Sequence, residues 1–298
     1  MPGLAGRKAL PEPVNSREAE GEIVMSNEHS NPRKLESWDG AEAYEAYMAR
    51  WSRLIARDFV AWLEVPPGCA WLDVGCGTGG LTRIVLETGH PAKVLGVDPS
   101  AYYVAYAGEQ LTDPRVGFRV GRAQALSGEA GAYDVVVSGL VLNFVPDTDR
   151  PEVLNGMVRA ARPGGLVAAY VWDYADGMQL MRYFWDAASA LDPRSAELDA
   201  GQRFPFCKPE PLAEAFRAAG LGDVLVRPID IETVFRDFDD YWLPFLGGQG
   251  SAPTYTVSLT EDRRQELRQH LRARLPFAPD GSIHLTARAW AVRGVNPA

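Results

Sequence analysis

The feature that most constrains this chain is a run of glycines between an apolar stretch and a helical one. Residues 70–74 are mostly apolar, and three glycines with single spacers follow, Gly75, Gly77 and Gly79, before the helical run 81–86. Glycine permits positive φ angles and lets a ligand lie directly against the main chain. Amides at the start of the following helix suit an anion. The stretch therefore predicts a strand, a ligand-binding loop and a helix.

Two kinds of ligand compete for this loop. A G-x-G-x-x-G spacing would indicate a dinucleotide site. Here the loop reads GCGTGG, and an acid, Asp73, stands two residues before the first glycine. That D-x-G-x-G-x-G pattern resembles the first motif of the class I S-adenosylmethionine (SAM) dependent methyltransferases, in which the acid and the loop hold the amino-acid end of SAM. A glycine turn without any ligand is the remaining alternative.

Charge and composition narrow the class of partner. The 30 Lys and Arg against 39 Asp and Glu give a net charge of −9, and no basic block is evident, so we do not expect nucleic acid as a partner. No apolar run approaches the ~18–20 residues of a membrane span, and no secretion signal opens the chain. Cys69, Cys76 and Cys207 have neither metal-ligand nor disulfide spacing. We expect a cytoplasmic monomer or homodimer with no metal.

The chain divides into two unequal regions. Residues 1–35 carry four prolines and no sustained periodicity, which predicts a disordered extension. We expect translation to begin at Met25, which the intact mass of the protein from its host would test. Residues 36–298 are expected to form one domain, in which a lid helix (36–66), a cofactor-binding half (67–171) and substrate-covering helices with the final strands (172–298) follow one another.

Strand and helix patterns alternate up to residue 171, which predicts a parallel doubly wound sheet. After the strand led by the glycine loop, the further strands of this half are expected at 93–98, 116–120, 132–138 and 166–171. A helix at 177–191 is apolar on two sides, so it must be an insertion covered on both. Two more strands are expected at 224–235 and 283–292. The predicted fold is α/β and Rossmann-like, a seven-stranded, mostly parallel sheet with an antiparallel last strand and a helical insertion after the fifth.

Asp98 ends the second predicted strand and is the second acid of the predicted site. It follows Gly79 by 19 residues, close to the separation at which an acid meets ribose hydroxyls in nucleotide folds. A helix N-cap is the alternative, but Pro99 follows directly and Ser100 is the better cap for a helix over 101–111. The sequence VDPS also resembles the second motif of the methyltransferase family.

One position departs from the family pattern. The third strand is followed by Gly121-Arg122-Ala123, where the family usually has an acid that accepts a hydrogen bond from the adenine amine. Arg122 cannot accept a hydrogen bond. The resemblance therefore implies that the main-chain amide of Ala123 and the side chain of Gln124 take over the adenine contact.

The fourth strand opens with the family's Y-D-V-V pattern at 133–136, and RPGG at 162–165 precedes the fifth strand. The resemblance implies that the segment after the fourth strand passes between cofactor and acceptor. Asn143 would lie there, with a turn residue as the alternative. The predicted SAM contacts are Asp73, Gly75, Cys76, Gly77, Thr78, Gly79, Asp98, Pro99, Ala123, Gln124, Ser138 and Leu140.

The acceptor site is expected between two aromatic-rich regions. An aromatic stripe on the helix over 41–62 is more often core than ligand site, but the resemblance implies a lid, which makes Trp38, Tyr47 and Arg50 candidates for closing the site. In the family, the region after the fifth strand builds the acceptor pocket, and core packing is the alternative here too. The candidates there are Trp172, Tyr174, Met181 and Trp185. These side chains predict a small, partly apolar or aromatic acceptor.

The chemistry implied by the resemblance asks little of side chains. The SAM sulfonium already activates its methyl group, so an N, O, S or carbon nucleophile can displace it in line, and orientation can supply ~7–11 kcal/mol of the barrier. A base is needed only if the nucleophile must lose a proton. None of the four histidines lies in a base motif, and Asp173 is the one predicted catalytic acid. A non-catalytic SAM-binding protein and a nucleotide-dependent oxidoreductase remain alternatives.

Overall fold

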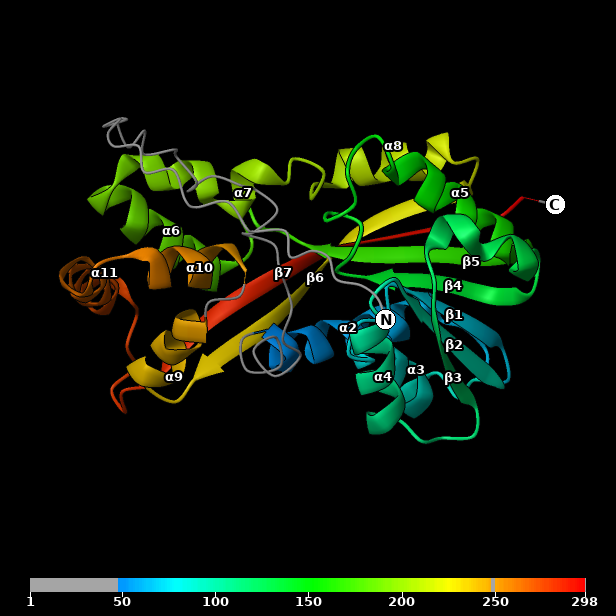
Figure 1. The fold of residues 1–298 in the computed structure, drawn as a ribbon, viewed down its shortest axis with the longest axis horizontal. Coiled ribbons are helices and arrows are strands. Elements are labelled where there is room, and N and C mark those ends of the chain that lie inside the picture. Colours follow the sequence, from blue (N-terminus) through cyan, green and yellow to red (C-terminus); the bar gives the residue numbers. More distant parts are fainter. Residues whose placement is uncertain (1–47, 248–249, 298) are drawn as a thin grey trace, which may run out of the picture. The chain divides into compact units, whose positions relative to one another are not determined.

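Seven strands form one sheet in the order β3-β2-β1-β4-β5-β7-β6 (Figure 1). The computed structural model describes residues 48–247 and 250–297, so the predictions for Trp38, Tyr47 and the extension over 1–35 lie outside the described residues. The strands are β1 (Ala70–Val74), β2 (Lys93–Asp98), β3 (Val116–Val120), β4 (Tyr133–Gly139), β5 (Ala161–Trp172), β6 (Gly222–Phe235) and β7 (Ile283–Val295).

The winding of the sheet reverses between β1 and β4. β1 pairs in parallel with both β2 and β4, and the pairs β2–β3 and β4–β5 are also parallel. Only β7 runs antiparallel, against β5 on one side and β6 on the other, which confirms the predicted antiparallel last strand. In open α/β sheets, ligands bind at the carboxyl ends of the strands where the order reverses. Here that place is the ends of β1 and β4.

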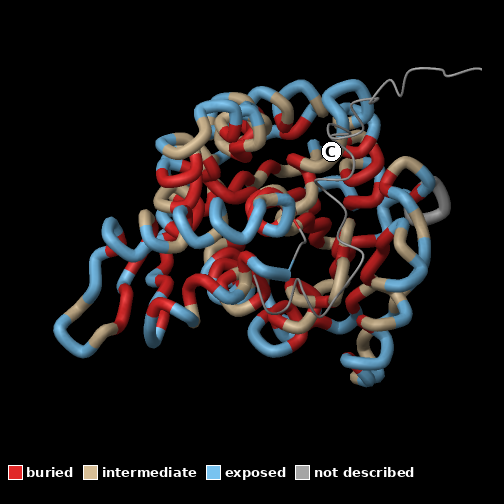
Figure 2. The backbone as a smooth tube through the Cα atoms, turned by 60° about the vertical axis from the view of Figure 1, so that its left-hand side comes forward, coloured by how far each residue is buried: buried red, intermediate tan, exposed pale blue. Residues whose placement is uncertain are grey.

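Helices cover both faces of the sheet (Figure 1). On one face α2 (Arg50–Leu63) packs against α3 (Gly80–Thr88), and α4 (Ala101–Gln110) packs on β2 and β3. On the other, α5 (Arg150–Ala160) contacts the short helix η2 (Ala123–Glu129) and α8 (Pro209–Ala218). Figure 2 shows the buried segments in the interior and the exposed ones on the outer turns of the helices.

The remaining helices gather around the far ends of β6 and β7, and we call them the cap (Figure 1). They are α6 (Gln179–Leu191), η3 (Pro193–Leu198), α7 (Ala200–Arg203), α9 (Phe238–Trp242), η4 (Leu243–Gly247), α10 (Ser251–Ser258) and α11 (Glu261–Arg274). Their core is aromatic: the ring of Phe184 stacks on Phe245 at 4.5 Å and meets Trp185 edge-on at 5.1 Å. This packing covers the two apolar sides expected of the insertion helix.

Local sequence signals explain several boundaries. The second and third strands coincide with the predicted ranges, and Ser100 caps α4 as expected, because its hydroxyl accepts a hydrogen bond from the Tyr103 amide (3.3 Å). None of the helices formed by the described residues is both long and apolar enough to cross a bilayer.

Candidate functional site

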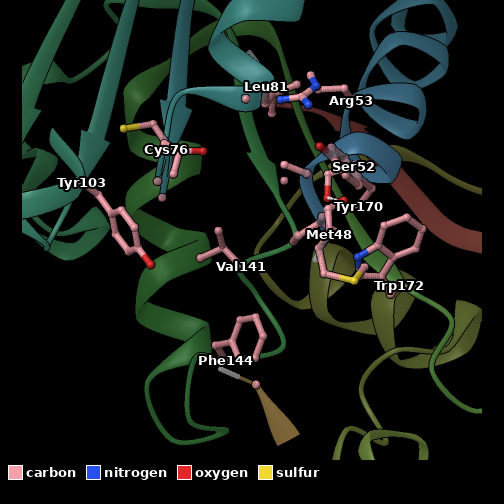
Figure 3. A pocket seen from close by; sticks show the side chains of 18 of the residues that line it. Met48, Ser52, Arg53, Cys76, Leu81, Tyr103, Val141, Phe144, Tyr170 and Trp172 are labelled. Carbon is pink, nitrogen blue, oxygen red and sulfur yellow. Dashed lines mark hydrogen bonds between the residues drawn. The ribbon is translucent and has the colours of Figure 1, made fainter. Parts of the chain in front are cut away.

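A cavity of about 210 Å³ lies at the carboxyl ends of the strands, where the winding reverses (Figure 3). The glycine loop, the ends of β2, β4 and β5, the first turns of α2 and α4, and the cap all contribute to its wall. Of the predicted residues, the cavity is lined by Asp73, Gly75, Cys76, Gly77, Thr78, Asp98, Leu140, Trp172, Tyr174 and Met181. The strand-loop-helix stretch and the region after β5 thus meet at one place.

The glycine loop needs its glycines for two different reasons. Gly75, Gly77 and Gly79 all have positive φ angles of 78°, 51° and 83°, which side chains disfavour. A Cβ at Gly75 would lie 2.6 Å from Cγ2 of Val141, so this glycine also permits close packing. A Cβ at Gly77 would meet nothing within 4 Å. The main chain of Gly77 therefore faces open space, as expected of a loop that holds a ligand.

Asp98 ends β2 inside the cavity and organises the loop. Its Oδ2 accepts a hydrogen bond from the Gly77 amide (3.0 Å) and its Oδ1 one from the Ser100 amide (2.8 Å). Burial raises the pKa of this carboxyl, and these two hydrogen bonds oppose the rise. Each carboxylate oxygen can accept a second hydrogen bond, so Asp98 can bind hydroxyl groups of a ligand while it holds the loop.

Asp73 is a buried acid with one unsatisfied oxygen. The Thr82 hydroxyl donates to its Oδ2 (2.7 Å), whereas its Oδ1 has no hydrogen-bond partner among the described residues. Burial raises the pKa of Asp73 to about 7, the negative charge of Asp98 adds to the rise, and the Thr82 hydrogen bonds oppose it. Buried polar atoms are rarely left without partners. An ionised Asp73 is therefore suited to a cationic ligand.

The end of β4 places a strained residue against the cavity. Leu140 has a φ of +61°, and its amide donates to the carbonyl of Tyr170 (2.8 Å). Residues other than glycine are strained in this left-handed backbone conformation, and such residues cluster at functional sites. Ser138, which was also predicted to contact the cofactor, is fully buried and does not line the cavity; its hydroxyl donates to the Val74 carbonyl (2.8 Å) and ties β4 to β1.

Four further residues that were predicted to contact SAM, among them the two assigned to adenine, Ala123 and Gln124, do not line the cavity. Pro99 is exposed, and Gln124 and Gly79 are not among the lining residues. Ala123 is buried against α5, where a Cβ at Gly156 would be 2.2 Å from the Ala123 carbonyl oxygen. The binding roles of these residues stay predictions.

A group of aromatic rings also lines the cavity, and we call it the aromatic wall. The ring of Phe204 lies 5.4 Å from Phe144 and 5.5 Å from Tyr174, and all three line the cavity, as does Trp172. Trp185 does not: it is 1% exposed and packs against aromatic rings of the cap, so the alternative of core packing holds for it. Its indole points into the cap core, whereas Met181, one turn earlier on α6, reaches the cavity.

Three other predicted residues do not line the cavity. The carboxylate of Asp173 accepts from the Asp176 amide (3.2 Å) and holds the turn before α6; burial raises its pKa, but it does not line the cavity. Arg50 forms an ion pair with Asp240 (3.1 Å). Asn143 is 5% exposed, and neither polar atom of its amide has a partner in the described part of the chain. The catalytic role of Asp173 stays a prediction that this geometry does not support.

Several lining residues were not predicted. In Figure 3 the Tyr103 hydroxyl and Phe144 point into the cavity, and Arg53 of α2 lies on the same side as Leu81 at the start of α3. Tyr103 could have been predicted, because it lies on the first turn of a helix capped directly after Asp98. Tyr170 lies on the predicted fifth strand. The remainder come from segments without a motif and include Met48, Ser52, Ala200, Arg203 and Ser251.

Metal ligands do not gather in this part of the protein. Within residues 48–247 and 250–297, no three His, Cys, Asp or Glu side chains lie close enough together to hold a metal ion.

Comparisons with known proteins point to one family. A family model described as a methyltransferase domain matches residues 72–165. The 2-methyl-6-phytyl-1,4-hydroquinone methyltransferase of Synechocystis sp. is 32% identical over 190 residues, which are 62% of this chain and 57% of that protein. The trans-aconitate 2-methyltransferase of Streptomyces avermitilis is 28% identical over 277 residues, 88% of this chain and 98% of that one. The chain spans about half the length of the first curated relatives it matches.

A solved structure supports the fold. The phosphoethanolamine N-methyltransferase 2 of Haemonchus contortus, in complex with phosphomonomethylethanolamine and S-adenosylhomocysteine, superposes with a TM-score of 0.54 at 18% identity, covering 86% of this chain and 57% of that one. The family model spans the glycine loop, Asp98 and the strands up to β5, which are the elements that build one side of the cavity. The sheet, the motifs and these relatives support a class I SAM-dependent methyltransferase family for this chain.

Proposed function

We propose that this protein transfers the methyl group of SAM to a small acceptor with an aromatic or partly apolar body. One observation carries the proposal: a single cavity joins an acidic, glycine-lined side, with Asp73, Asp98 and the open main chain of Gly77, to an aromatic side built by Phe144, Tyr174 and neighbouring rings.

The residues on the acidic side fit SAM. SAM is cationic at its amino and sulfonium groups, and the unpartnered Oδ1 of Asp73 suits a cation. Asp98 retains acceptor capacity for the two ribose hydroxyls. Arg53 lies on the cavity side of α2, where a guanidinium can bind the carboxylate of the amino-acid end (Figure 3). We assign the cofactor to this side.

When bound, SAM supplies a methyl group activated by a sulfonium. The residues of the chain orient the acceptor and exclude water, and such positioning can supply ~7–11 kcal/mol of the barrier. Trp172, Tyr174 and Phe204 give flat apolar surfaces, and the hydroxyls of Tyr103 and Tyr170 can hydrogen-bond a polar group of the acceptor. No histidine is among the described lining residues, so we assign no general base.

The named relatives support a small-molecule acceptor. One is a hydroquinone methyltransferase and another a trans-aconitate methyltransferase, so the matched relatives include both an apolar aromatic and a polar acidic acceptor. The aromatic wall suits the body of the first kind of molecule.

The test separates this function from its two alternatives. Thermal shift is measured with SAM, S-adenosylhomocysteine and NAD; we expect stabilisation by the first two and none by NAD. Stabilisation by NAD alone would indicate a nucleotide-dependent oxidoreductase. Formation of S-adenosylhomocysteine is then followed with a panel of hydroquinones, phenols and aromatic or aliphatic carboxylic acids. Binding of SAM without turnover of any member would favour the non-catalytic alternative.

A further inference from the structure

Charged side chains line both sides of the cavity, and both acids lie on one of them. Among the described residues that line it, the charged side chains are Asp73, Asp98, Arg53 and Arg203. Both acids and Arg53 lie at the glycine loop and the helices beside it. Arg203 comes from α7 in the cap, next to Phe204 of the aromatic wall. A cation thus stands on the side that we assign to the acceptor.

The cap holds Arg203 in place through its neighbours. Asp199 caps α7, because its carboxylate accepts from the Gly201 amide (2.8 Å), and the same carboxylate forms an ion pair with Arg182 of α6. The guanidinium carbon of Arg203 lies 5.4 Å from the ring centroid of Phe204, within the range of a cation–π contact. The capped turn thus holds the main chain of this helix, and the guanidinium of Arg203 lies beside an aromatic ring that also lines the cavity.

The N-terminus of α10 adds a partial positive charge to the same side of the cavity. Gly250 and Ser251, at the N-terminus of α10, also line the cavity, and α10 packs on η3, which leads into α7. No side chain of the described residues caps this helix. First-turn amides carry partial positive charge and favour anions. The N-terminus of α10 therefore adds to the positive potential around Arg203, but it is not an anion-binding site by itself.

We propose that the methyl acceptor carries an anionic group, a carboxylate or a phosphate, and that Arg203 binds this group while the wall of Phe144, Tyr174 and Phe204 holds the body of the molecule. The inference rests on the proposed function, since it assigns the acceptor to the side opposite the cofactor. Arg203 is then the residue that selects acidic acceptors over neutral ones, because a guanidinium binds a carboxylate or phosphate through two parallel hydrogen bonds.

The experiment uses the full-length chain saturated with S-adenosylhomocysteine. Binding of 3-phenylpropionate, phenyl phosphate and the uncharged 3-phenylpropionamide is measured by NMR titration, and the two acids distinguish the carboxylate from the phosphate. We expect at least one acid to bind tenfold or more tighter than the amide. Arg203→Gln should abolish that preference and Arg203→Lys should retain part of it. Arg194→Gln, on the same part of the cap but with an 88% exposed side chain, should leave it unchanged.

The outcomes separate the two proposals. If S-adenosylhomocysteine itself fails to bind, the proposed function is wrong. If it binds but the amide binds as well as both acids, or no acid binds, or the preference survives in Arg203→Gln, the anionic acceptor is wrong while the methyltransferase function stands. Loss of the preference in Arg194→Gln as well would also overturn the specific role of Arg203.

Discussion

The two sides of the cavity are built in different ways. The cofactor side comes from Arg53 of α2, the stretch 73–81 and Asp98 at the end of β2, and its loop holds Gly75 and Gly77 at positive φ. The acceptor side is made of side chains spread from Phe144 to Ser251, on the loop after β4, the end of β5 and three helices of the cap. The first depends on local backbone geometry and the second on long-range packing. The two sides should therefore respond differently to substitution.

The largest expected effect lies in the cap core. Trp185 is fully buried among Phe184 and Tyr255, so Trp185→Ala should lower the free energy of unfolding by ~3–5 kcal/mol. S-adenosylhomocysteine affinity should stay within threefold of wild type, because Trp185 does not line the cavity. Urea unfolding and calorimetry measure the two quantities. A tenfold loss of affinity in a folded variant would show that the two sides are not independent.

The next effect is the pH dependence of stability caused by Asp73. Its pKa is about 7 in the folded protein against 3.8 as the ordinary value, so between these pH values the folded state binds more protons than the unfolded state. The free energy of unfolding should therefore fall as pH rises from 4 to 7, by about 4 kcal/mol at most. Urea unfolding of the ligand-free protein at pH 5 and pH 8 measures the slope.

Two variants isolate that slope. Asp73→Asn cannot titrate and should be less dependent on pH than wild type. Asp113→Asn should keep the wild-type slope. Hydrogen bonds from Arg115 lower the pKa of Asp113 to about 2, so the Asp113 carboxyl is ionised in both the folded and the unfolded protein between pH 5 and pH 8. An unchanged slope in Asp73→Asn would refute the buried acid as its source.

On the cofactor side, Gly77→Val should weaken S-adenosylhomocysteine binding about a hundredfold, or ~2.7 kcal/mol. The new side chain strains a left-handed residue and enters the open space that faces the ligand. Gly131→Val is the matched control, since Gly131 also has a positive φ and an open Cβ position but does not line the cavity. Equal loss of affinity in both variants would mean that backbone strain alone is responsible.

The smallest effect is expected at Asp173. Because its carboxylate holds a turn outside the cavity lining, Asp173→Asn should change the rate of methyl transfer by less than threefold, measured as S-adenosylhomocysteine formation at saturating SAM. A loss of a hundredfold or more with unchanged thermal stability would restore Asp173 as a catalytic acid.

The sequence predicts the cofactor side because the residues that build it form short motifs of neighbouring positions. Glycines at single spacing and an acid ending a buried strand predicted the places of Asp73, Gly77 and Asp98, and the alternation of strands predicted the sheet. Ser138 and Ala123 follow the family pattern, yet their side chains are buried outside the cavity lining. A motif marks a segment and does not say which way each of its side chains points.

The sequence predicts only some of the residues that line the acceptor side. Met181 and Trp185 lie one turn apart on the same side of α6, and periodicity cannot say where along that side the cavity ends and the cap core begins. Arg203 and Ser251 belong to helices of four and eight residues, too short for an amphipathic pattern. Asp199 caps the helix that carries Arg203, and Gly250 precedes the helix that carries Ser251. The positions of both helices depend on the assembled cap.

The central claim is that Asp98 and the glycine loop form a SAM site. The most direct measurement is calorimetric titration of S-adenosylhomocysteine into wild type, Asp98→Ala and, as a surface control, Asp113→Ala. We predict binding by wild type and by Asp113→Ala, and affinity at least a hundredfold weaker, or ~2.7 kcal/mol, in Asp98→Ala. Absence of binding by the wild-type protein, or equal binding by all three proteins, would contradict the account.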